Sequence, residues 1–144
     1  MRKILFALVL ALPMAAFAQQ SPVGTWTTID DETGKPKSVV EISQAGDGSL
    51  VGTVVEVLQS EQGPDPVCSE CSGDRKDQPI EGMQIIWGVK QGRGGDWGGG
   101  KILDPASGKV YSVKMETTGG GQTLEVRGFM GFSLLGRTQE WQRR

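Results

Sequence analysis

The sequence predicts an all-β protein, an eight-stranded antiparallel up-and-down β-barrel that follows a cleaved signal peptide. After the first 18 residues, apolar side chains alternate with polar ones, which is typical of half-buried strands and not of helices. Gly-rich and Pro-containing turns separate these stretches, most of them short. Strands joined in order by short turns form a meander, and closure into a barrel removes its exposed edges. A two-sheet sandwich is the alternative.

Eight segments show this alternation. In the third we expect Val51, Val55 and Val57 on one face, and in the fourth Trp87 and Val89. In the seventh, Leu124 alternates with Glu125. The predicted strands are 24–30, 37–43, 49–58, 82–89, 96–103, 109–116, 122–129 and 135–142.

The N-terminus has the three parts of a secretory signal. Arg2 and Lys3 precede an apolar run that ends in Ala16-Phe17-Ala18, small residues of the kind that precede a cleavage site. The run is short for a membrane span, which needs about 20 apolar residues, and no later segment of the chain is apolar enough to cross a bilayer. We therefore expect cleavage after Ala18, a periplasmic location, and a single domain over residues 19–144.

Composition excludes several functions. Without Arg2 and Lys3, 13 of the 15 basic residues remain against 17 acidic ones, so nothing suggests the basic patch that nucleic acids require. The chain has no His, which removes the usual general base, the commonest metal ligand and the Ser-His and Cys-His catalytic pairs. We predict that the protein is not an enzyme and carries no cofactor.

Cys68 and Cys71 lie in the one long connection, at about residues 59–81. In the periplasm two nearby thiols are expected to be oxidised, so we predict a small disulfide that staples this loop. A redox role would need a thiolate stabilised by a helix N-terminus, whereas Pro66 and Gly73 indicate a loop and Glu70 adds negative charge. Zinc usually takes about four ligands, which two Cys alone do not supply.

The first and last predicted strands carry a further pattern. Gly24-Thr25-Trp26 opens the domain, and Arg137 lies in the last strand. This pairing resembles the closing signature of lipocalin-like barrels, in which a late Arg packs across the early Trp and seals one end. A guanidinium stacks well on an indole ring. The resemblance therefore assigns barrel closure to Gly24, Trp26 and Arg137.

The whole chain after residue 24 resembles a more specific family, the bacterial exported proteins called domain of unknown function 2147. The resemblance implies a lipocalin-like fold and export, and it brings no established activity and no catalytic residues. The matching segments are 24–26, Arg75 with Pro79 and Gly82, Trp97 with 99–102, 104–105, 108–111, 124–128 and 136–138 with Trp141.

Aromatic side chains on several predicted strands are candidates for a ligand site: Trp87, Trp97, Tyr111 and Phe129. Apolar and aromatic residues with few polar groups suit a small hydrophobic or amphipathic ligand, and Arg127 is a candidate to orient a carboxylate head group. The same inward positions would also serve a filled core.

Three functions follow from these observations. The leading hypothesis is a non-enzymatic periplasmic lipocalin-like protein that binds a small hydrophobic or amphipathic ligand. The second is a module that binds an envelope protein partner through loops at the barrel end, and exposed apolar residues in 59–81 or 128–135 would favour it. The third is a redox or metal-binding protein that uses Cys68 and Cys71.

Overall fold

The computed structural model describes residues 20–132 and 134–144, so the predicted signal peptide, 1–18, lies outside the described residues. Two short 3-10 turns, η1 (Gly73–Arg75) and η2 (Gly119–Gly121), accompany eight strands. The strands are β1 (Gly24–Ile29), β2 (Pro36–Gln44), β3 (Leu50–Val57), β4 (Gln84–Gln91), β5 (Trp97–Asp104), β6 (Lys109–Thr118), β7 (Thr123–Phe129) and β8 (Gly136–Arg143).

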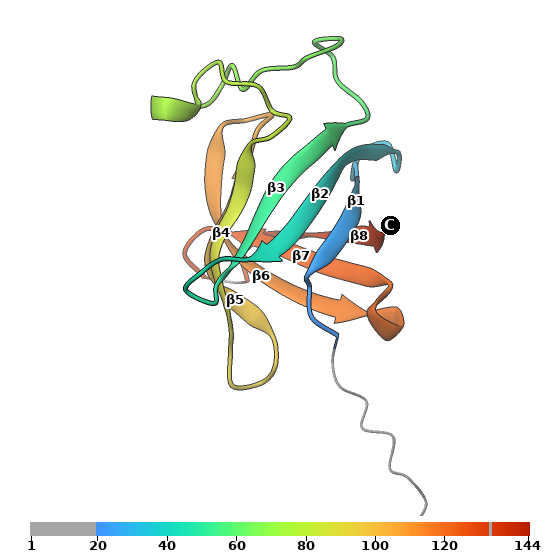
Figure 1. Cartoon of the computed structure of the whole chain (residues 1–144), viewed down its shortest axis with the longest axis vertical. Helices are drawn as coiled ribbons and strands as arrows, with labels where there is room; N and C mark the ends of the chain where they lie inside the picture. The colour runs from blue at the N-terminus through green and yellow to red at the C-terminus, as the bar shows by residue number, and fades with distance from the viewer. Residues whose placement is uncertain (1–19, 133) are drawn as a thin grey trace, which may run out of the picture.

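The strands form one closed barrel in sequence order, and every neighbouring pair is antiparallel (Figure 1). The predicted fold class is confirmed, and the sandwich alternative is wrong. Alternation and turn residues predict the strand ends well, and each predicted boundary lies within two residues of the observed one. No helix of the described residues is long and apolar enough to cross a membrane.

The inner face of the barrel is filled by apolar side chains that alternate with outward polar ones. Gly52 shows how tight this packing is, because a Cβ there would lie 3.0 Å from two atoms of Ile86. This part of the barrel interior therefore holds its own side chains. The largest fully buried ones include Trp26, Ile42, Leu50, Ile86, Met115 and Leu124.

Irregularities in two strands overturn part of the predicted alternation. The β2–β3 register shifts between Val39 and Val40, so Val57 pairs with Ser38 on the inner face while Val55 is 44% exposed on the outer face. In β4, Gly88 adopts a left-handed φ of 69°, so Val89 faces the core while Trp87 pairs with Lys101 on the outside. A bulge adds one residue to one strand and thereby moves the following side chains to the other face.

One end of the barrel, here the closed end, is sealed by the C-terminal end of β8. The Arg143 guanidinium lies 4.2 Å from the centroid of Trp26. Its Nε donates to the carbonyl of Gly121 at 2.6 Å, and its Nη atoms reach the carbonyls of Val23 and Ser21. A Cβ at Gly24 would collide with this guanidinium, so a side chain there would displace it.

The roles predicted for Gly24 and Trp26 fit this arrangement, but the one predicted for Arg137 is wrong. Arg137 lies at the opposite end of β8, exposed, and forms an ion pair with Asp31. Because β8 runs antiparallel to β1, the residues next to the start of β1 are those at the end of β8. Arg143 therefore closes the barrel.

We expect Arg143→Ala to lower the free energy of unfolding by about 2–4 kcal/mol, because it removes charge-assisted hydrogen bonds and a cation–π contact. Arg137→Ala is the matched control, and its exposed ion pair should contribute less than about 1 kcal/mol. Urea unfolding followed by Trp fluorescence measures both. Equal losses in the two variants would contradict the assignment.

Candidate functional site

The end opposite Arg143, here the loop end, carries the β1–β2, β3–β4, β5–β6 and β7–β8 connections (Figure 1). The strands are less completely joined there. β8 pairs with β7 along its length, from Gly136 to Gln142, but with β1 only at Trp26–Arg143 and Thr27–Gln142 among the described residues. The barrel wall between β1 and β8 is therefore unpaired toward the loop end.

Across this unpaired part of the wall, the Nε of Arg137 donates to a carboxylate oxygen of Asp31 in the β1–β2 connection. Arg137 pairs with Gly128, which faces the barrel interior beside Tyr111. Its side chain is 67% exposed, and the described residues provide no second partner for it. The Nη groups of this guanidinium are thus open to a ligand at the loop end.

Asp30 orders the turn that presents Asp31. Its Oδ1 accepts hydrogen bonds from the backbone N–H groups of Glu32 and Thr33, each at 2.9 Å. The hydrogen bond from the Thr33 backbone is the largest of the effects that hold the pKa of Asp30 below its usual value. The hydrogen bonds from the Glu32 backbone and the Thr33 hydroxyl and the charge of Lys37 lower this pKa further. Desolvation opposes them and is smaller than the Thr33 backbone effect. The turn is therefore ordered by a carboxylate that remains ionised.

The inward positions nearest the loop end differ from the filled core below them. Val57, Ile102, Tyr111 and Gln139 are each half-buried, and with Arg137 they form what we call the mouth. Beside them the hydroxyls of Thr28 and Ser38 share a hydrogen bond of 2.8 Å. The mouth thus combines apolar walls, neutral polar groups and one cation.

The structure does not bring the five predicted ligand-binding residues together. Tyr111 faces the mouth as expected. Trp97 lies at the start of β5, near the closed end, where it packs against the core. Trp87, Phe129 and Arg127 all point outward.

The reason for this separation is geometric. The Gly88 irregularity puts Trp87 and Val89 on opposite faces, and on the outer face the Arg75 guanidinium lies 4.6 Å from the Trp87 ring centroid. Phe129 and Arg127 alternate with the inward Gly128, and Lys114 approaches the Phe129 ring at 5.7 Å. The structure therefore does not place these five residues around one cavity.

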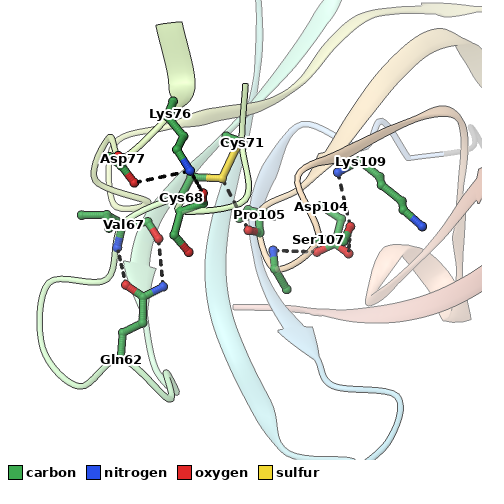
Figure 2. The surroundings of a disulfide bond; sticks show 12 residues. Gln62, Val67, Cys68, Cys71, Lys76, Asp77, Asp104, Pro105, Ser107 and Lys109 are labelled. Atoms are coloured by element: carbon green, nitrogen blue, oxygen red, sulfur yellow. Dashed lines mark hydrogen bonds and ion pairs between the residues drawn. A yellow bond between two sulfur atoms is a disulfide. The ribbon is translucent and has the colours of Figure 1, made fainter. Parts of the chain in front are cut away.

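The long β3–β4 connection packs beside the β5–β6 turn, with Cys68 next to Pro105 (Figure 2). The predicted disulfide between Cys68 and Cys71 is present, and both residues are buried. The Cys68 sulfur lies 3.4 Å from the carbonyl oxygen of Pro105. Gly108, with a φ of 71°, passes so close to the Glu70 carbonyl that a Cβ would collide with it.

This packing bears on the alternative functions of the two Cys residues. A redox disulfide must be reached by a partner thiol, whereas Cys68 and Cys71 are both buried. Within residues 20–132 and 134–144, no group of three or more Cys, Asp or Glu side chains is placed to hold a metal ion. The buried position favours the structural role.

Two surface hollows border the long connection. One, of about 360 Å³, is lined by residues such as Arg75, Pro79 and Met83. The other, of about 430 Å³, includes Val57 and Leu58 and so adjoins the mouth. Both volumes lie in the range of small-molecule sites, about 300–1,000 Å³.

Comparisons with known proteins agree with this fold. Residues 24–143 match the family of uncharacterized proteins conserved in bacteria, domain of unknown function 2147, and the chain belongs to that family. A solved Helicobacter pylori protein, described as belonging to the lipocalin family, matches with a TM-score of 0.71 and 19% identity over 85% of this chain and 82% of that chain. No curated protein matches the sequence significantly.

These matches define the class of the protein: a lipocalin-like eight-stranded barrel of a bacterial family without an assigned activity. At 19% identity the likeness concerns the fold alone. Sequence reasoning placed the family and the disulfide correctly. It missed the contact of Arg143 with Trp26 and the ion pair of Arg137 with Asp31, although the antiparallel order of β1 and β8 was a usable signal for the first.

We expect Cys68→Ser/Cys71→Ser to lower the free energy of unfolding by about 2 kcal/mol, the chain-entropy value for so short a loop. Gly108→Ala should have a similar effect without touching sulfur, because it disturbs the same contact. Chemical unfolding and the rate of proteolysis within residues 59–81 measure both. Unchanged stability and unchanged proteolysis in both variants would show that this packing contributes nothing.

Proposed function

We propose that this protein is a non-enzymatic periplasmic binding protein that holds a small amphipathic acid at the mouth of its barrel. The signal-like N-terminus supports export. The lipocalin-like fold supports small-molecule binding, and the absence of His argues against the commonest acid–base chemistry. The periplasmic location and the ligand are both parts of the proposal.

The observation that carries the proposal is the contrast between the two ends of the barrel. At the closed end Arg143 contacts Trp26 and three backbone carbonyls, which seals the interior. At the loop end the β1–β8 wall is unpaired and the inward side chains are half-buried. In the part of the chain that the structure describes, the loop end is therefore the more open route for a ligand, and the filled core limits its depth to the mouth.

The chemistry of the mouth selects the ligand class. Val57, Ile102 and Tyr111 offer apolar surface to a hydrocarbon tail. The guanidinium of Arg137 has donors left over from its bond to Asp31, and an Arg fork matches a carboxylate in geometry and charge. The combination fits a single-chain fatty acid better than a neutral apolar molecule.

One observation also favours a second candidate function, contact with another component of the bacterial envelope. Met130, Phe132, Leu134 and Leu135 in the β7–β8 connection are all exposed. Exposed apolar residues in this segment were the feature expected of an interaction module. The two functions use different surfaces, so they are compatible in one protein.

We expect protein purified without detergent to bind palmitate, and we expect Arg137→Gln to weaken that binding about tenfold, because a charge-assisted hydrogen bond is lost. Isothermal titration with palmitate and native mass spectrometry measure the affinity and the stoichiometry. Arg127→Gln is the matched control, because it removes the same charge from the outer wall and should leave palmitate affinity unchanged.

Two results would count against this proposal. A protein that binds no palmitate, alone or after exposure to envelope lipid extracts, would remove the carrier function. Equal weakening by Arg137→Gln and Arg127→Gln would remove the mouth as the location, because the effect would then reflect net charge.

A further inference from the structure

Four large apolar side chains of the β7–β8 connection form what we call the apolar tip: Met130, Phe132, Leu134 and Leu135. Their exposed fractions are 53%, 79%, 89% and 73%, respectively. A hydrogen bond of 3.0 Å from the Leu135 N–H to the Phe132 carbonyl closes the connection into a turn. Soluble proteins rarely gather exposed apolar residues in this way unless the patch binds something.

The outer wall below the apolar tip is ordered by charge. Strands β6, β7 and β8 place their outward side chains in rows, since Ser112, Phe129 and Gly136 pair across the strands nearest the tip. The next row down pairs Lys114, Arg127 and Thr138, and the row below that pairs Glu116, Glu125 and Glu140. Moving away from the tip, these three strands therefore present Phe129, then two cations, then three carboxylates, and Lys101 of β5 reaches the Ser112 hydroxyl of the first row at 3.1 Å.

Two contacts hold the basic row in place. Lys114 lies over the Phe129 ring at 5.7 Å, which ties this cation to the apolar side of the wall. Arg127 donates to the Thr138 hydroxyl at 3.0 Å. Successive outward rows are about 7 Å apart along a strand, so the two cations lie just behind the apolar tip.

The acidic row lowers the stability of the barrel, and the packing of the fold gives no reason for this arrangement. Glu125 stands directly opposite Glu116 on one side and Glu140 on the other. Like charges that face each other across strands destabilise a sheet by about 0.2–1 kcal/mol per pair. A function that needs negative charge held away from a surface gives a reason for this arrangement.

We propose that the apolar tip and the basic row behind it dock this protein on the surface of an anionic phospholipid bilayer. In this orientation the four apolar side chains enter the interface, and Lys114 and Arg127 lie at the level of the phosphate groups. The acidic row is held away from the anionic surface and sets the tilt of the barrel. The three rows follow one direction, as the polarity of a bilayer surface does along its normal.

This docking does not rest on the proposed ligand binding, because the mouth and the outer wall carry different side chains. The two are related in space: β7 holds Arg127 on its outer face and Gly128, next to Arg137, on its inner face. A bilayer contacted by the apolar tip would therefore lie beside the mouth. Such a position suits the uptake or release of a single-chain amphiphile.

The test is sedimentation of the chain from residue 19 onward with vesicles of phosphatidylcholine, with and without about one-third phosphatidylglycerol. We expect binding to the anionic vesicles and little to the neutral ones. Phe132→Ser/Leu134→Ser should reduce the anionic binding at least tenfold, because a few kcal/mol of apolar transfer is lost. Lys114→Gln/Arg127→Gln should reduce it about fivefold for each cation removed.

The matched control is Val55→Ser, which removes an exposed apolar side chain from the wall of β3 and should leave vesicle binding unchanged. The proposal is overturned if the protein ignores anionic vesicles, or if Val55→Ser acts as strongly as the tip variant. It is equally overturned if the purified protein self-associates on size exclusion through the tip and does not bind vesicles, because the tip would then be an interface between copies. Phe132→Ser/Leu134→Ser separates the two proposals, since it should weaken vesicle binding and leave palmitate binding in solution unchanged.

Discussion

The joint between the first and last strands is the constraint on which the rest of this barrel depends. Seven of the eight strand pairs are made by neighbours in the sequence, whereas β1 and β8 must find each other across the whole chain. They meet over two residue pairs, and Arg143 reinforces that short contact by covering Trp26 and binding backbone carbonyls around it. The filled core lies behind this joint, and the mouth begins where the joint ends.

Two arginines of β8 lie at opposite ends of the barrel and have different surroundings. Arg137 and Arg143 are six residues apart, so both belong to the inward-facing set of β8. Arg143 is enclosed by Trp26 and three carbonyl oxygens, which makes it part of the packed structure. Arg137 is held from one side by Asp31 and is otherwise exposed, which leaves it able to meet a charged ligand.

Much of the fold could be predicted from the sequence, because alternation and turn chemistry are local. The strand boundaries, the closed meander and the Cys68–Cys71 disulfide all follow from such signals. The site could not be predicted to the same degree. A single left-handed residue, Gly88, puts Trp87 and Val89 on opposite faces. Alternation alone cannot distinguish Arg137 from Arg143 because both share one face. Register decides these points, and register depends on contacts far apart in the chain.

On the outer wall of β6, β7 and β8, as at the mouth, the placement of charged side chains bears on function. A barrel needs its inward residues for packing, so its outward residues are free to vary, and an ordered series among them calls for a physical cause. Cations placed between the carboxylates would relieve the repulsion at Glu125, yet Lys114 and Arg127 lie in the row next to Phe129 and Lys101 reaches the row beyond it. Stability alone favours the first arrangement. The observed order lowers the stability slightly and gives the wall a gradient of charge. Under the proposed docking, this gradient orients the protein on a bilayer with the open end of the barrel beside the lipid.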